Sequence, residues 1–182
     1  MTPGLDLGDP VAAARALIGW TLLVEGVGGP IVEAEAYRHD DPASHAFPGP
    51  TVRNAVMFGP PGRLYVYLAY GIHWCVNIVC GPEGVGGGVL IRALEPVEAI
   101  DVMRTRRGRD ELRELTSGPG RVGQALGAGP WLAGQPADLR PPDHARDVVA
   151  TVRIGISRAV DRPWRFIDPD SPYGSRRARR AA

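Results

Sequence analysis

Three short runs rich in β-branched and aromatic residues, between residues 63 and 94, limit the possible folds more than any other part of the chain. They read RLYVYLA, HWCVNIVC and GVLIRAL, and the segments between them, AYGI and PEGVGGG, are typical of turns. Connections this short join strands as hairpins. The sequence therefore predicts a largely antiparallel sheet.

The rest of the chain predicts helices and further strands around this sheet. PVAAARALIG resembles a short helix closed by Gly19, and WTLLVEG and PIVEAEAY resemble a hairpin joined at GVGG. Further helices are predicted in EPVEAIDVMRTRR, with Pro96 near its start, in RDELREL and in SGPGRVGQALG, and final strands in ATVRIGIS and WRFIDP. We expect one compact domain of the α/β class, α+β type, over residues 1–175, with a basic tail at 176–182.

Strand alternation along IVEAEAY separates two sets of side chains. The small apolar set, Val32, Ala34 and Ala36, is the natural core face. The opposite set holds two carboxylates and a tyrosine: Ile31, Glu33, Glu35 and Tyr37. This second face is either the wall of a pocket or a solvated polar edge, and the pattern alone leaves both open.

The chain has five tyrosines, and three of them, Tyr65, Tyr67 and Tyr70, lie close together. Tyr65 and Tyr67 share one face of a predicted strand, whereas Tyr70 lies in the turn and projects toward solvent. An exposed ring at a hairpin tip suits insertion between nucleic-acid bases, although a turn tyrosine packed on its neighbours is the commoner arrangement.

Two polar residues interrupt apolar strands. Asn77 requires hydrogen-bond partners, either from the backbone or from a ligand. Arg92 requires a nearby carboxylate, such as Glu35, because an unpaired buried charge is very unfavourable.

The long polar segment HDDPASHAFPGPTVRNAVMFGPPG indicates a functional surface loop with a helical turn near RNAVMF. It contains four side chains of metal-ligand type, namely His39, Asp40, Asp41 and His45. A metal-dependent hydrolase is thus one alternative, but their spacing matches no metal signature, and a simply polar loop explains them equally well. We predict no metal and no cofactor.

Charge and composition exclude some functions. All 21 basic residues are arginine, so no lysine is available to form a Schiff base with a carbonyl. Cys75 and Cys80 lie five apart on a predicted strand, should face opposite sides, and are expected to be reduced. The chain has no apolar run long enough to span a membrane and no signal-peptide pattern at its start, so we expect a cytoplasmic protein.

Taken in order, several of these motifs resemble one known family. EAEAY, a histidine eight residues after its tyrosine, GRLYVYLAYGIHWCVNI and VLIRALEP are similar to motifs of the alkyladenine (3-methyladenine) DNA glycosylases. The resemblance extends from about Ala14 to Phe166, with PGRVGQALG and RPWRF as later landmarks. It implies a curved, mostly antiparallel sheet resembling the C-terminal domain of methionyl-tRNA formyltransferase.

The resemblance also implies an activity. Such an enzyme flips an alkylated or deaminated purine out of double-stranded DNA and hydrolyses its bond to deoxyribose, leaving an abasic site. The implied lesions are 3-methyladenine, 7-methylguanine, hypoxanthine and ethenoadenine. The implied protein is a monofunctional monomer whose partner is duplex DNA containing damaged purines.

By position, the resemblance assigns roles to individual residues. Glu35 matches the carboxylate that activates the attacking water, which Arg92 and the region of His45 help to hold. Tyr37 matches the ring on one face of the flipped base, with Tyr67 and His45 on the other. The backbone amide of His45 would read the edge of the purine.

Two further positions match residues concerned with selectivity and DNA distortion. Asn77 matches the residue that crowds the amino group of guanine. Tyr70 matches the side chain that fills the gap left by the extruded nucleotide. A nucleic-acid-binding module without catalysis is the remaining alternative, and Glu35 counts against it, because a carboxylate is unfavourable in a phosphate-binding groove.

Overall fold

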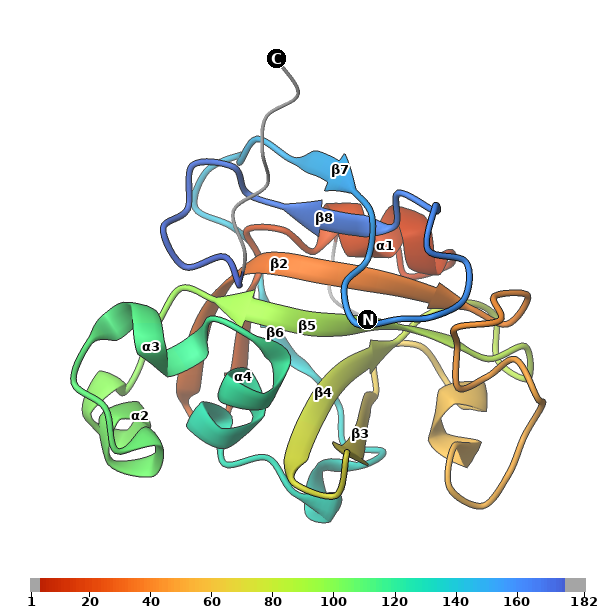
Figure 1. Cartoon of the computed structure of the whole chain (residues 1–182), viewed down its shortest axis with the longest axis horizontal. Helices are drawn as coiled ribbons and strands as arrows, with labels where there is room; N and C mark the ends of the chain where they lie inside the picture. Colours follow the sequence, from red (N-terminus) through yellow and green to blue (C-terminus); the bar gives the residue numbers. More distant parts are fainter. Residues whose placement is uncertain (1–3, 176–182) are drawn as a thin grey trace.

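Strand β2 (Val27–Arg38) organises the sheet in the computed structural model, which describes residues 4–175 (Figure 1). Its first residues pair with β1 (Thr21–Val24), and its later residues pair with β5 (Gly87–Leu94). Part of its length also pairs with the short strand β8 (Arg165–Ile167). The segment that carries the two candidate carboxylates is therefore central in the sheet.

The remaining strands extend this arrangement, and every pairing is antiparallel. Beyond β5 lie β4 (His73–Val79) and β3 (Leu64–Ala69), which form a hairpin. Beyond β1 lies β6 (Asp138–Arg140), and β7 (Val149–Thr151) pairs with β8. The order β3-β4-β5-β2-β1-β6 confirms the predicted antiparallel sheet in a single α+β domain, although β6 was not predicted.

Few helices accompany the sheet. The three α-helices after β5 gather beside the ends of β4 and β5, whereas the first helix lies along β2 and β8 (Figure 1). The helices are α1 (Pro10–Ala16), α2 (Ile100–Arg107), α3 (Leu112–Thr116) and α4 (Pro119–Leu126), with 3-10 turns η1 (Ala55–Phe58) and η2 (Pro130–Leu132).

One apolar core joins α1, α4 and the sheet. Leu17 at the C-terminal end of α1, Leu126 of α4 and Ile78 of β4 all belong to it and are fully buried. Helix α4 lies directly on β4, because a Cβ atom at Gly123 would lie 1.9 Å from the carbonyl oxygen of Trp74. Near the N-terminal end of α4, Gly120 lies against His73, the first residue of β4, so this end lies next to the β3–β4 hairpin.

Some predicted boundaries are wrong, each for a local reason. The β1–β2 turn is Glu25–Gly26 rather than GVGG, and both residues have positive φ (51° and 77°), as a tight hairpin turn requires. Helix α2 begins only at Ile100, because Glu98 donates its amide to the carbonyl of Gly28 (2.9 Å) and Ala99 has left-handed backbone (φ 56°). The last strands are shorter than predicted, and residues 152–156 form irregular backbone.

The predicted face of Ile31 is also wrong. Register shifts in the pairing with β5 lie on both sides of Glu33. A bulge of this kind changes which way the following side chains point. Ile31 consequently packs in the main core with Ala34 and Ala36, whereas Glu33 and Glu35 remain among polar partners.

Both cysteines are buried and free, as expected. Among residues 4–175, no helix is long and apolar enough to cross a membrane. The predicted basic tail, residues 176–182, lies outside the described residues.

Candidate active site

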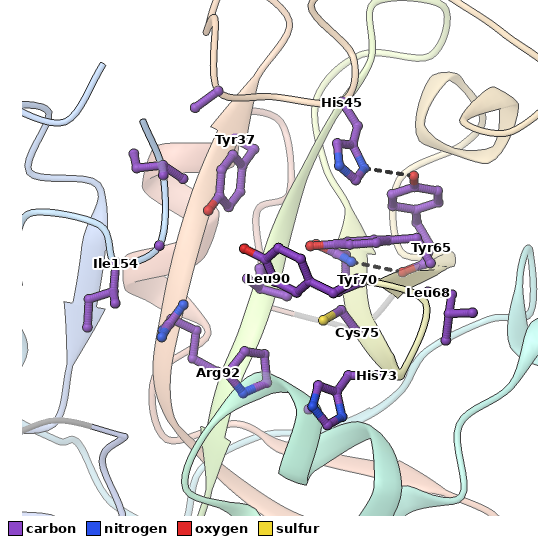
Figure 2. Close-up of a pocket in the computed structure, with 18 of the residues that line it drawn as sticks. Tyr37, His45, Tyr65, Leu68, Tyr70, His73, Cys75, Leu90, Arg92 and Ile154 are labelled. Atoms are coloured by element: carbon purple, nitrogen blue, oxygen red, sulfur yellow. Dashed lines mark hydrogen bonds between the residues drawn. The ribbon is translucent and has the colours of Figure 1, made fainter. Parts of the chain in front are cut away.

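A pocket of about 480 Å³ opens between the long loop, the β3–β4 hairpin and the start of α4 (Figure 2). The predicted site residues that line it are Tyr37, His45, Tyr67, Tyr70, Asn77 and Arg92. Glu35 lies directly behind this lining, because the three groups that bind its carboxylate come from Tyr37, Arg92 and Ile154, which all line the pocket. The fold thus brings every predicted site residue to one place.

Aromatic rings form one wall of the pocket. The ring centroids of His45 and Tyr67 lie 4.4 Å apart, and Tyr65 stacks on Tyr67 at 5.7 Å. The Nδ1 atom of His45 lies 3.0 Å from the hydroxyl of Tyr65, so Tyr65, itself buried, orients the histidine. Burial, followed by the nearby charge of Arg53, lowers the pKa of His45 below its usual value, which keeps the ring neutral at neutral pH.

The loop that carries His45 is held by a residue that sequence reasoning missed. Asn54 is buried and donates to the carbonyl oxygens of His45 (2.7 Å) and Gly49 (3.0 Å), while its Oδ1 accepts from the amide of Thr51 (2.6 Å). Nothing in the sequence of a polar loop distinguishes an asparagine that binds the loop backbone from one that is exposed. The contacts give the loop a defined shape at the pocket.

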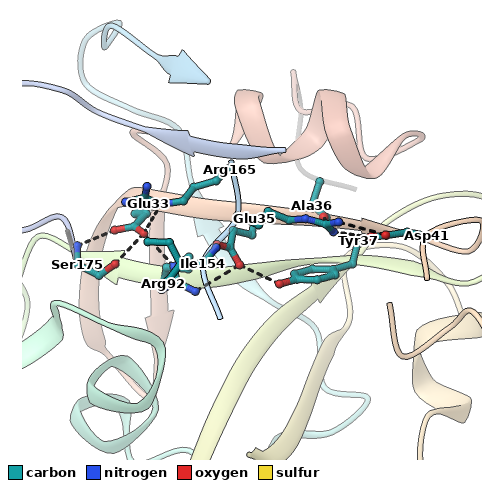
Figure 3. A network of polar contacts seen from close by, with 10 residues as sticks. Glu33, Glu35, Ala36, Tyr37, Asp41, Arg92, Ile154, Arg165 and Ser175 are labelled. Atoms are coloured by element: carbon teal, nitrogen blue, oxygen red, sulfur yellow. Dashed lines mark hydrogen bonds and ion pairs between the residues drawn. The ribbon is translucent and has the colours of Figure 1, made fainter. Parts of the chain in front are cut away.

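Glu35 is fully buried but well supplied with hydrogen-bond donors (Figure 3). Its Oε2 accepts from the Tyr37 hydroxyl (2.8 Å) and from Arg92 Nη1 (3.3 Å), and its Oε1 accepts from the amide of Ile154 (2.8 Å). The predicted Arg92–Glu35 pair is confirmed. A solvated polar edge is excluded. The pKa of Tyr37 is raised, mainly by burial and next by the charge of Glu35. Tyr37 therefore stays protonated and can donate its hydrogen bond.

A second carboxylate, Glu33, lies beside Glu35 in the same network (Figure 3). It is fully buried and accepts hydrogen bonds from Arg92 Nε (2.8 Å) and Arg165 Nε (2.7 Å). Ser175 donates twice to it, through its hydroxyl (2.7 Å) and its backbone amide (2.6 Å). Burial alone would raise the pKa of Glu33, but Arg165 and Arg92 outweigh it and lower the pKa. Sequence reasoning found neither Arg165 nor Ser175.

The loop acids and histidines do not form the alternative metal site. Asp41 is buried and forms an ion pair with Arg153, and His45 contacts Tyr65. Within residues 4–175, no group of three or more His, Cys, Asp and Glu side chains is placed to hold a metal ion.

Asn77 and Tyr70 lie at different depths of the pocket. Asn77 is buried and donates through Nδ2 to the carbonyl oxygen of Tyr65 (3.1 Å), which leaves its Oδ1 as a further acceptor. Tyr70 lies at the hairpin tip, is 89% exposed and has a positive φ of 51°. It projects toward solvent, as predicted.

Aromatic rings beside a buried carboxylate form a pocket suited to a flat heteroaromatic ring and to general-base hydrolysis next to it. An α+β domain with this site belongs to the class of hydrolytic enzymes that act on a substrate with a heteroaromatic base. The family profile described as "Methylpurine-DNA glycosylase (MPG)" matches residues 6–172. The chain belongs to this family and is a DNA glycosylase, an enzyme that hydrolyses N-glycosyl bonds in DNA.

Curated relatives agree with the family. A protein of Nitrosospira multiformis is 57% identical over 180 residues, covering 96% of this chain and 93% of its own. One from Rhodopseudomonas palustris strain HaA2 is 58% identical over 158 residues, covering 84% and 79%. One from Agrobacterium fabrum is 54% identical over 163 residues, covering 87% and 83%. All three carry the name "Putative 3-methyladenine DNA glycosylase". The resemblance seen in the sequence is confirmed.

Proposed function

We propose that this glycosylase flips alkylated or deaminated purines out of duplex DNA and hydrolyses the bond between the base and deoxyribose. The proposed lesions are 3-methyladenine, 7-methylguanine, hypoxanthine and ethenoadenine. The observation that carries the proposal is the fully buried carboxylate of Glu35, bound by three residues that line an aromatic pocket.

The flipped base lies between two aromatic surfaces. Tyr37 covers one face of the base, and His45 with Tyr67 covers the other. Arg153 already occupies one face of the Tyr37 ring, with its guanidinium carbon 4.7 Å from the centroid, so the opposite face is the one that meets the base. Stacking of this kind contributes roughly 1–3 kcal/mol per ring by comparison with single-strand binding, which offsets the few kcal/mol needed for extrusion.

Glu35 acts as the general base. Each carboxylate oxygen accepts about two hydrogen bonds, so Oε1, which accepts only the Ile154 amide among residues 4–175, has a site left for a water proton. The water oxygen bonds to the sugar carbon, its proton passes to Glu35, and the electron pair of the breaking bond leaves with the purine. The negative charge of Glu35 also stabilises the cationic sugar carbon.

Arg92 helps to hold the water. Its Nε and Nη1 donate to Glu33 and Glu35, and its Nη2 has no hydrogen-bond acceptor within residues 4–175. Because Arg92 lines the pocket, Nη2 is available to orient the nucleophile there. Arg92 thus links the buried network to the reacting atoms.

Selectivity and the course of the reaction follow from other residues. Asn77 crowds the amino group of guanine at the base of the pocket, and Tyr70 fills the space vacated in the duplex. The chain contains no lysine that could attack the sugar as an amine, so base release leaves an unbroken abasic strand.

The first test is single-turnover release of hypoxanthine and 3-methyladenine from duplex DNA by wild type and Glu35→Gln. We expect a loss of about 10²–10⁴-fold in rate for Glu35→Gln, the usual contribution of a general base. Release should persist with a chelator, and strand breaks should appear only after alkali.

The matched control is Glu25→Gln, which removes a carboxylate from the exposed β1–β2 turn. It should release both bases at the wild-type rate. Tight duplex binding with no release of either lesion by wild type would overturn the proposal and favour a noncatalytic module.

A further inference from the structure

A buried cation lies behind the ring proposed to stack on the base. The guanidinium carbon of Arg153 is 4.7 Å from the centroid of Tyr37 and 5.3 Å from that of Trp164. Arg153 is only 5% exposed, and its Nε has no hydrogen-bond partner among the described residues. The two aromatic rings are therefore a main part of its environment, in the geometry of a cation–π contact.

Asp41 holds this cation in place. Its carboxylate accepts from both terminal nitrogens of Arg153, with the Nη2–Oδ1 contact at 3.1 Å. Nη1 also donates to the carbonyl oxygen of Ala36 (2.9 Å), the residue between Glu35 and Tyr37. A planar guanidinium bound at both ends and against a ring has little freedom to move.

The same residue is adjacent to the candidate general base. Ile154, which follows Arg153 in the chain, donates its amide to Oε1 of Glu35 (2.8 Å). Anchoring Arg153 therefore fixes two elements of the site together: the stacking ring and one donor to the carboxylate.

We propose that Arg153 is a positioning residue that also influences lesion choice: its charge behind Tyr37 weakens the attraction of that ring for a cationic base and so favours neutral damaged purines. This inference rests on the proposed function. An aromatic face attracts a cation through its electron-rich surface. A ring that already holds a cation on one face attracts a second one less, and the two positive charges repel each other.

The charge of Arg153 acts on Tyr37 in the folded protein. Burial is the largest cause of the raised pKa of Tyr37 and Glu35 the next, whereas Arg153 opposes both. The charge of Arg153 therefore acts on the ring although Arg153 is paired with Asp41.

The test compares a cationic lesion, 7-methylguanine, with a neutral one, hypoxanthine, in the same duplex sequence under single-turnover conditions. The variant is Asp41→Asn with Arg153→Gln, which removes both charges of the buried pair. We expect the ratio of 7-methylguanine release to hypoxanthine release to rise about threefold to tenfold, which lies within the range expected of a cation–π contact. Arg153→Lys keeps the charge, so it should slow both reactions but leave the ratio close to wild type.

Arg162→Gln is the matched control. Arg162 stacks on Trp164 at 4.6 Å and lies 3.8 Å from Asp41, so its loss removes a cation from the same cluster but not from the ring of Tyr37. The release ratio should not change. A thermal melt shows whether each variant folds, and Asp41→Asn with Arg153→Met is the substitute if the glutamine variant does not, since methionine packs well against aromatic rings.

The outcomes separate the two proposals. If wild type releases neither base, the proposed function fails, and this inference fails with it. If wild type releases bases and a folded double variant loses both activities equally, Arg153 has only a structural role and this inference alone is wrong.

Discussion

Two carboxylates two residues apart have opposite surroundings. Among the described residues, Glu33 accepts four hydrogen bonds: three at Oε1, from Arg92, Arg165 and the Ser175 hydroxyl, and one at Oε2, from the Ser175 amide. Glu35 accepts three among the same residues, two at Oε2 and one at Oε1, and all three come from residues that line the pocket. Arg165 and Ser175 do not line the pocket, which suits a structural role in which Glu33 orients Arg92. Every donor to Glu35 lines the pocket, which suits the proposed role in the reaction.

The structural role of Glu33 predicts a pH-dependent stability. Its pKa in the folded protein lies below the usual value of 4.5, so its contribution to stability is present above that pH and is lost as the pH falls through the lower folded value. We expect Glu33→Gln to be destabilised by about 3–5 kcal/mol at pH 7, because Arg92 and Arg165 each lose a buried ionic contact.

Thermal melts between pH 7 and about pH 3 check this prediction. The melting temperature of wild type should approach that of Glu33→Gln as the pH falls below about 4.5. If the difference in melting temperature between the two proteins stays constant across this pH range, the ionised form of Glu33 adds nothing to stability.

At the scale of the elements, the β3–β4 hairpin presents a residue in an unfavourable conformation. Tyr70 has a φ of 51° and is 89% exposed. A left-handed conformation costs a non-glycine residue roughly 1–2 kcal/mol. Neither burial nor backbone preference explains a tyrosine there, which supports the proposal that the exposed ring contacts DNA.

Tyr70→Gly should therefore lower activity without a large loss of stability. We expect the free energy of unfolding to rise or stay within about 1 kcal/mol of wild type, because glycine adopts positive φ freely. Release of hypoxanthine from duplex DNA should fall, whereas release from single-stranded DNA, where no gap needs filling, should change much less.

Ile72→Ala serves as the comparison for this hairpin. Ile72 is also exposed at the tip, at 70%, but carries no ring. Equal losses on duplex and single-stranded DNA for Tyr70→Gly would show that the tyrosine does not act as a wedge.

At the scale of the whole molecule, charge is distributed unevenly along the chain. Residues 1–50 hold seven acids and two arginines, a net charge of −5, and residues 51–182 hold thirteen acids and nineteen arginines, a net charge of +6. Residues 176–182 contain four arginines and no acid, so without them the net charge changes from +1 to −3. The tail therefore decides the sign of the net charge.

This distribution predicts how DNA affinity depends on salt. Replacing the four tail arginines with glutamine should weaken duplex binding and make the slope of log K against log salt shallower, by up to about 0.9 per lost phosphate contact. The single-turnover rate at saturating enzyme should not change. Replacement with lysine keeps the charge and should preserve the slope, and equal slopes for all three proteins would show that the tail does not contact DNA.

Much of the fold could be predicted because its signals are local. The β3–β4–β5 meander follows from alternating residues and short turns, and Arg92 with Glu35 follows from the need to neutralise a buried charge. The resemblance of the ordered motifs indicated the family, which the family match confirms. The roles assigned to individual site residues stay predictions.

The sequence by itself determined the strands, their antiparallel pairing and the polar face that carries Glu35. Only the tertiary structure decided the bulge at Glu33, which places Ile31 in the core. It also decided that Arg165 pairs with Glu33 and Arg153 with Asp41. Arg165 lies 132 residues from Glu33, and Arg153 lies 112 from Asp41. Strand alternation reports only which neighbouring side chains share a face, whereas the pairing of buried charges depends on which distant segments the sheet brings together.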